Sequence, residues 1–110
     1  MPIDNPEKVD GLGMDKATGE AVLLIADHLD WSDLDVHADL LTQKIEAYLN
    51  FIRSGQLMRV LPEAEGQPVK IALYHQHEPS SRGKQLLENA KAQLAELGIT
   101  LAYGALPRGY

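Results

Sequence analysis

The spacing of apolar and polar residues changes several times along this chain of 110 residues. An unbroken apolar run over residues 21–26 is typical of a buried strand, and residues 9–14 before it predict the first strand of a hairpin. Gly19, in the loop between them, supplies the positive φ that a hairpin loop of four or five residues often needs. The segment from residue 9 to residue 26 therefore predicts two paired strands.

A long amphipathic helix is predicted after this hairpin. Ser32 stands three residues before Asp35, as in a capping box with a shorter acid, and Trp31 just before it can pack on Val36 as a hydrophobic staple. Gly55 is the expected left-handed stop. Apolar residues recur at steps of three and four along one face of the helix: Leu34, Ala38, Leu41, Ile45, Tyr48, Leu49 and Ile52.

The next segment contains turn-forming residues and has no regular spacing of apolar residues. Residues 56–68 contain two prolines and a glycine and show no sustained period, which indicates a surface connection with a short extended piece around residues 58–61. Residues 69–74 then alternate strictly, so that every second side chain faces the same way. This alternation predicts a strand with one face toward the core.

A second helix and a last strand complete the pattern. Ser80 or Ser81 can cap a helix that runs to Leu97 and is closed by Gly98. Residues 99–103 alternate again as a strand. The inward stripe of this helix is expected to be Leu86, Leu87, Ala90, Leu94 and Leu97.

The element order β-β-α-β-α-β predicts an α+β two-layer sandwich, with two helices on one face of a mixed four-stranded sheet. The last strand, helix and strand are expected to form parallel neighbours with a right-handed connection, unless another strand lies between them. The length predicts a single domain over residues 1–110. Its ordered core is expected at about residues 8–103, with residues 1–7 and 104–110 flexible.

Composition narrows the function classes. The net charge of −6 and the scattered Lys and Arg disfavour nucleic-acid binding and favour a basic partner. The absence of cysteine excludes disulfides, a thiol nucleophile and thiolate zinc sites. No segment reaches the roughly 18 consecutive apolar residues of a membrane span. The first residues lack the basic start and apolar stretch of a signal peptide, so a cytoplasmic protein is expected.

The acidic corner, residues 27–35, is the first candidate site. Its carboxylates and imidazoles have the chemistry of a divalent metal site, but their spacing matches no EF-hand loop, and acids at a helix start are also explained by capping and by the helix dipole. A tryptophan beside carboxylates can instead anchor a basic partner. The residues considered for partner binding are Asp27, Asp30, Trp31, Asp33 and Asp35.

Three histidines form a second candidate site. His75 and His77 lie two apart at a strand end, so both would project from one face and could share a metal. No third ligand is evident in the sequence, and no metal is assigned. His28 also ends a strand, and it would approach the other two if the two strands were neighbours.

The turn before the second helix is an anion candidate. Ser80, Ser81 and Arg82 combine hydroxyls, a cation and free backbone N–H groups, which attract phosphate, sulfate or carboxylate. The G-x-x-x-x-G-K-[ST] string of a Walker loop is absent. Helix capping with solvated charges explains the same residues.

Three stretches resemble a bacterial family of small proteins of unknown function. They are the hairpin VDGLGMDKATGEAVLLIADHLDW, the helix with His37 followed by LL and ending in IEAYLNFIRSGQL, and the later PEAEGQPVKIALYHQHEPSSRG. The likeness spans roughly residues 8–103. It implies a bacterial cytoplasmic domain and brings no reaction, cofactor or catalytic residue.

The sequence favours a non-enzymatic interaction or regulatory module that contacts a basic protein through the acidic corner. It contains no cysteine and no G-x-S-x-G nucleophile elbow, and no catalytic residue or cofactor is assigned. The alternative is a metal- or anion-binding protein that uses the histidines and the turn at Ser80. No membrane or nucleic-acid partner is expected, and the protein is expected to be a monomer or a homodimer paired through a free edge or face of the sheet.

Overall fold

The computed structural model describes residues 10–106, and the four predicted strands form one mixed sheet. The strands lie in the order β1-β2-β3-β4, with β1 antiparallel to β2 and the other neighbours parallel. β3 and β4 are direct neighbours, so no strand separates them. The strand bounds are Gly11–Met14 for β1, Ala21–Asp27 for β2, Val69–His75 for β3 and Ile99–Ala105 for β4.

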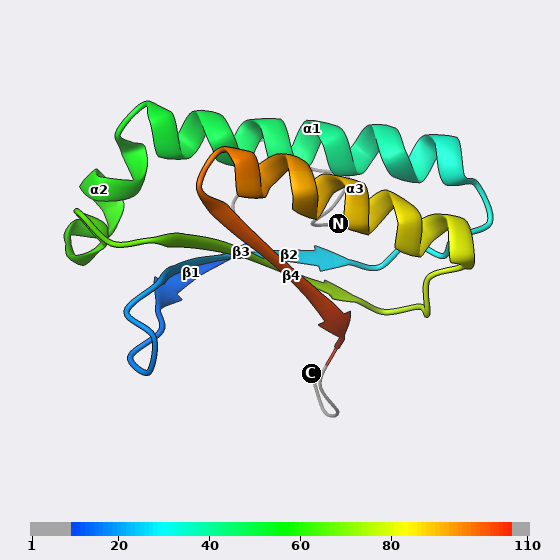
Figure 1. Ribbon diagram of the computed structural model, residues 1–110, viewed down its shortest axis with the longest axis horizontal. Helices are drawn as coiled ribbons and strands as arrows, with labels where there is room; N and C mark the ends of the chain where they lie inside the picture. Colours follow the sequence, from blue (N-terminus) through cyan, green and yellow to red (C-terminus); the bar gives the residue numbers. More distant parts are fainter. Residues whose placement is uncertain (1–9, 107–110) are drawn as a thin grey trace.

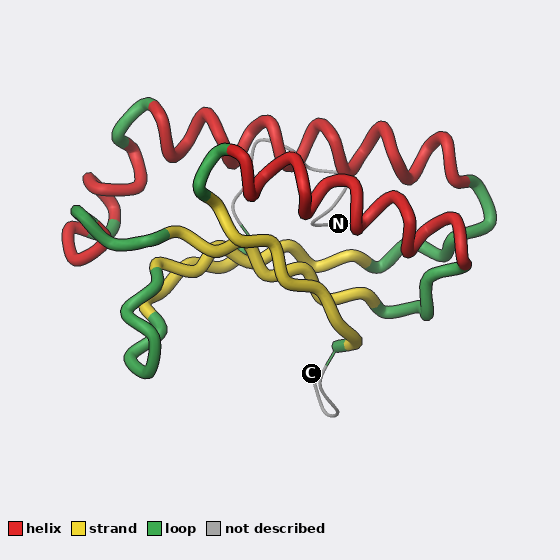
Figure 2. Tube along the Cα trace, in the orientation of Figure 1, coloured by secondary structure: helices red, strands yellow, loops and turns green. Residues whose placement is uncertain are grey.

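Two long helices form the second layer. α1 (Leu34–Arg53) and α3 (Ser81–Glu96) lie on the same face of the sheet (Figure 1). Figure 2 shows the strands below both helices, and no helix of residues 10–106 covers the other face. The β-β-α-β-α-β order and the two-layer α+β fold predicted from the sequence are therefore confirmed.

The core lies between these two layers. Alternate residues of the central strands face the helices, and the parallel register places Leu23 beside Ile71 and Ile25 beside Leu73. Burying apolar surface in this way is the main favourable term in folding. The largest enclosed apolar side chains are Leu23, Ile25, Leu41, Leu57, Ile71, Leu73, Leu87 and Leu101.

The start of α1 differs from the prediction. The N-cap is Asp33, whose carboxylate accepts from the Val36 N–H at 3.2 Å. The Ser32 hydroxyl is engaged elsewhere, because it donates to Asp30 Oδ1 at 2.5 Å. Val36 is 50% exposed, and Trp31 stacks on His37 instead of forming a staple with Val36. The predicted cap and staple were therefore wrong in detail, although the helix begins within two residues of the expected place.

The buried face of α1 is also rotated from the expected stripe. Its buried residues are His37, Leu41, Lys44 and Tyr48, at steps of four, three and four. Ile45, from the predicted apolar stripe, is only half-buried. Two polar side chains and a tyrosine thus take core positions because partners in β2 and just before β1 satisfy them, which apolar periodicity alone does not reveal.

The connection after α1 is more ordered than predicted. Residues 56–60 form a short helix, α2 (Gln56–Val60), and Pro62–Ala64 form a 3₁₀ turn. Leu57 and Ala64 are completely buried, so this segment closes one end of the core. The expected extended piece around residues 58–61 was wrong, because a five-residue helix is too short to show a period.

The last two elements largely follow the prediction. Ser80 caps α3 by accepting from the Gly83 N–H, and Gly98 has a φ of +78°. Leu97 is 51% exposed and leaves the expected inward stripe. β4 continues to Ala105, so residues 104 and 105, predicted to be flexible, belong to the sheet. The predictions for residues 1–7 and 107–110 lie outside the described residues.

Candidate functional site

The candidate site lies at the carboxyl ends of β2 and β3, where α1 and α3 begin. The last register pair of these parallel strands is Asp27 beside His75. In open sheets, ligands and partners often bind beyond the carboxyl ends of parallel strands, because loops and helix starts gather there. The acidic corner and the histidines predicted from the sequence do meet at this one edge.

A buried Asp–His pair lies beneath the surface at this edge of the sheet. The Asp27 Oδ2 and His37 Nε2 atoms are 2.5 Å apart, and the side chains are 0% and 1% exposed. The other ring nitrogen, His37 Nδ1, lies 3.1 Å from the Asp30 carbonyl oxygen and donates to it, because a carbonyl can only accept. Both ring nitrogens of His37 therefore have a hydrogen-bond partner. The result is a link from the end of β2 to the first turns of α1.

Trp31 is packed on this pair. Its ring stacks on His37 with centroids 3.7 Å apart and planes inclined by 18°. Its Nε1–H donates to the His77 carbonyl at 3.1 Å. The Gly83 backbone lies so close that a Cβ there would be 2.6 Å from Trp31 Cε3. Trp31 thus holds together the loop after β2, the loop after β3 and the first turn of α3.

The exposed acids of the corner have local roles. Asp30 accepts from the Ser32 hydroxyl and N–H, and these hydrogen bonds lower the pKa of Asp30 below its ordinary value. Asp33 caps α1, and Asp35 lies in the first turn, where the helix dipole favours a negative charge. These side chains are exposed, whereas Asp27 is buried and cannot touch a partner directly.

The structure brings together two of the three predicted histidines. His28 and His77 line a cavity of about 240 Å³ together with Asp30, Asp33 and His37. His75 is buried beside Asp27 and is not part of this lining. Among residues 10–106, no group of three or more His, Cys, Asp or Glu side chains is arranged to hold a metal ion. The His28 Nδ1 atom is buried and has no hydrogen-bond partner within this range.

The predicted anion turn is used mainly as a helix start. The Ser80 hydroxyl oxygen accepts from the Gly83 N–H at 3.1 Å, as a capping residue does. Ser81 and Arg82 are exposed in the first turn of α3. None of these three residues lines the cavity that contains His28 and His77.

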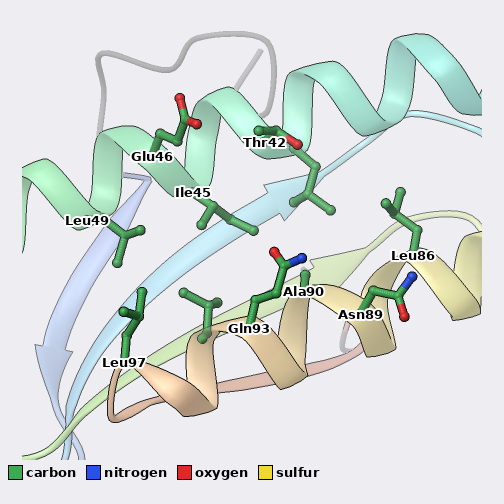
Figure 3. Close-up of a pocket in the computed structure, with 11 residues that line it drawn as sticks. Thr42, Ile45, Glu46, Leu49, Leu86, Asn89, Ala90, Gln93 and Leu97 are labelled. Carbon is green, nitrogen blue, oxygen red and sulfur yellow. The ribbon is translucent and has the colours of Figure 1, made fainter.

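A groove between α1 and α3 was missed by the sequence reasoning. It has a volume of about 380 Å³ and opens on the outer side of the helix layer, where Ile45 and Leu49 face Leu86 and Leu97 (Figure 3). It exists because the buried face of α1 is rotated, which leaves Leu41, Ile45 and Leu49 of the predicted apolar stripe beside α3. The remaining lining residues are Leu41, Thr42, Glu46, Asn89, Ala90, Gln93 and Leu94.

A buried ionic network beside β1 was also missed. Lys44 is fully buried, and its ammonium donates to Asp10 Oδ1 at 2.8 Å. Asp10 Oδ2 accepts from the Ala26 N–H at 2.9 Å, and the Tyr48 hydroxyl donates to the Leu24 carbonyl. Burial raises the pKa of Tyr48. Asp10 and Tyr48 thus form hydrogen bonds with backbone groups of β2 at the end where β1 no longer pairs with it. The signal available in the sequence was the four-residue step from Lys44 to Tyr48, which places both side chains on one face of α1.

Comparison with protein-family models matches residues 1–107 to a family of unknown function, DUF6572. The chain belongs to the DUF6572 family. This confirms the expectation of a family without an assigned role. Searches of the curated proteins and of the solved structures each find no match for this DUF6572 protein. Within residues 10–106, no helix is long and apolar enough to cross a bilayer.

Proposed function

We propose that this DUF6572 protein is a non-enzymatic interaction or regulatory module that binds a basic helical segment of a partner protein in the groove between α1 and α3. The observation that carries the proposal is an exposed apolar groove flanked by carboxylates. The bacterial cytoplasm remains the predicted compartment.

The groove has the features of a helix-binding surface. Its apolar residues form two rows, with Ile45 and Leu49 on α1 opposite Leu86 and Ala90 on α3 and Leu97 at the C-cap of α3. Amphipathic helices bind such grooves by inserting apolar anchors at steps of three and four residues. The lining contains one acid and no Lys or Arg, so it suits a helix with apolar anchors and basic flanks.

Negative charge runs beside the groove along α1. Asp35, Asp39 and Glu46 are exposed and lie on one side of the helix, since their spacings of four and seven residues return to the same side. The exposed Asp30 and Asp33 continue this line into the acidic corner. A surface of one sign steers and orients a partner of the opposite sign. The predicted contact at the acidic corner thus becomes one end of a longer surface.

The rigidity of the corner supports a binding role. Trp31 is held by stacking, by a hydrogen bond and by close packing on Gly83, so the acids around it are presented on a preformed support. A preformed surface loses less conformational entropy on binding. Asp27 and His37, a pair with the chemistry of an acid–base couple, lie beneath the surface, and a general base must reach the proton that it removes. This placement favours binding over catalysis.

Three single variants test the groove. Leu97→Lys and Glu46→Lys place a positive charge in or beside it, and Val60→Lys on α2 is the matched control because Val60 is 64% exposed and does not line the groove. Tagged proteins are used to enrich partners from a lysate of the source organism, and a partner found is purified and titrated by calorimetry. We expect a basic protein that binds the wild type and the control about equally and the groove variants at least about tenfold more weakly. Equal affinity for all four proteins would refute the proposal.

A second candidate function is binding of a small ligand by the histidine cavity. It is favoured by the pairing of His28 with His77 and by the unpartnered His28 Nδ1. A ligand at about 100 times its dissociation constant adds about 2.7 kcal/mol of stability. Thermal unfolding with divalent metal ions and with inorganic phosphate measures this effect. Unchanged melting of wild type and His28→Ala in all of them would rule out these ligands.

A further inference from the structure

β4 is the outermost strand of the sheet and exposes one edge of its backbone. The Leu106 N–H donates to the His75 carbonyl, so even-numbered residues of β4 direct their backbone groups toward β3. Backbone direction alternates along a strand, and therefore the N–H and C=O groups of Leu101, Tyr103 and Ala105 point away from the sheet. Within residues 10–106, no further strand lies on that side.

This edge lacks the features that normally protect an edge strand. Residues 99–105 contain no charge and no proline, and they pair with β3 along their whole length without a bulge. The opposite edge is different. β1 has only four residues, and beyond its start the Asp10 and Tyr48 side chains occupy the backbone groups of β2. A long, uncharged edge is a template for pairing with another strand, and proteins usually block such edges when they stay monomeric.

The helix above this edge carries charges that complement a second copy of the same chain. Glu88 accepts a hydrogen bond from the Tyr103 hydroxyl, so this side of α3 faces β4, and the bond raises the pKa of Tyr103. Lys91 is exposed about one turn further along on the same side. In a two-fold arrangement the two α3 helices run antiparallel. Glu88 of each copy then lies near Lys91 of the other, which is a reciprocal pair of opposite charges.

We infer that two copies of this chain associate through antiparallel pairing of their β4 strands, which joins two four-stranded sheets into one continuous sheet. Each strand satisfies the outward N–H and C=O groups of the other. Ala102 and Gly104, which lie on the uncovered face because the buried Leu101 faces the helices, have small side chains or none and leave room for close approach. The groove between α1 and α3 lies on the other side of α3, so the dimer keeps the surface of the proposed function free, and the two proposals can fail independently.

Sedimentation velocity of the purified chain tests the dimer directly. We expect the wild type to sediment as a dimer at about 100 µM. Ala105→Pro removes one outward N–H and leaves the bonds from β4 to β3 in place, so it should weaken dimerisation at least about tenfold. Circular dichroism establishes that each variant is folded. A wild type that is monomeric at this concentration, or an Ala105→Pro variant that dimerises as tightly as the wild type, would overturn the inference.

Charge exchange tests the predicted orientation. In Glu88→Lys, the new lysine of each copy would lie near Lys91 of the other, and this repulsion at both contacts should weaken the dimer about tenfold. The double variant Glu88→Lys, Lys91→Glu restores opposite charges. It should recover the wild-type dissociation constant within about threefold. Glu46→Lys, on α1 across the groove from α3, is the matched control and should dimerise like the wild type. A double variant that is no tighter than Glu88→Lys, or a control weakened as much as Glu88→Lys, would contradict the antiparallel β4 arrangement.

Discussion

Replacing Gly83 by alanine separates the contribution of the packed corner from that of helix propensity. Gly83 lies in the first turn of α3, where alanine is intrinsically favoured over glycine by up to about 1 kcal/mol. Propensity alone therefore predicts a stabilised protein. The structure predicts the opposite, because the new Cβ would lie 2.6 Å from Trp31 Cε3 and 3.0 Å from two further ring atoms.

The magnitude follows from what the Trp31 ring must give up to make room. Moving away from Gly83 weakens the stack on His37, which contributes roughly 0.5–1.5 kcal/mol. It also strains the hydrogen bond from Nε1–H to the His77 carbonyl, which contributes a similar amount of about 0.5–1.5 kcal/mol. After the gain in propensity, we expect a net destabilisation of about 1 kcal/mol. In a domain of this size, that lowers the melting temperature by about 4 °C.

Urea unfolding followed by circular dichroism measures the change, and fluorescence reports its cause because Trp31 is the only tryptophan. Displacement from His37 should change the native emission spectrum. Gly13→Ala is the control, since a Cβ there meets nothing within 4 Å; it should change neither the spectrum nor the stability by more than about 1 kcal/mol. A Gly83→Ala protein at least as stable as the wild type, with unchanged emission, would refute the packing argument.

Three further substitutions test the buried polar groups and the connection after α1. Asp27→Ala leaves His37 without its buried partner and should cost about 3–5 kcal/mol in urea unfolding, whereas Asp35→Ala at the exposed helix start should cost less than about 1 kcal/mol; equal losses would contradict the buried pair. Tyr48→Phe leaves two backbone groups unpaired and should cost about 1–3 kcal/mol. The folded state raises the pKa of Tyr48, so the unfolded chain loses the hydroxyl proton at a lower pH than the folded protein does. The free energy of unfolding of the wild type should therefore fall as the pH rises above about 10, and more steeply than that of Tyr48→Phe. Parallel pH profiles of the two proteins would contradict this prediction. Leu57→Ala leaves a cavity at a fully buried position of α2 and should lower the free energy of unfolding by about 2–5 kcal/mol. A loss below about 1 kcal/mol would indicate that residues 56–68 form a surface loop instead.

The sequence alone determined the features that depend on neighbouring residues. The alternation in residues 69–74, the hydroxyl before α3 and the left-handed glycines at positions 19, 55 and 98 each act over a few residues, and each was found where it was predicted. The order of strands and helices followed from these local signals. The fold class could be predicted for the same reason, because few arrangements bury two single-stripe helices on one sheet.

Only the tertiary structure decided which polar residues have partners. Asp27 meets His37 ten positions away and Asp10 meets Lys44 thirty-four positions away, because α1 lies across β2. A periodic pattern treats Lys44 and His37 as polar and assigns them to solvent, but a buried charge is stable where an opposite charge is held within hydrogen-bond distance. The rotated face of α1 and the groove beside α3 follow from these pairings. They depend on contacts between distant segments, and the spacing of residues along the chain does not contain that information.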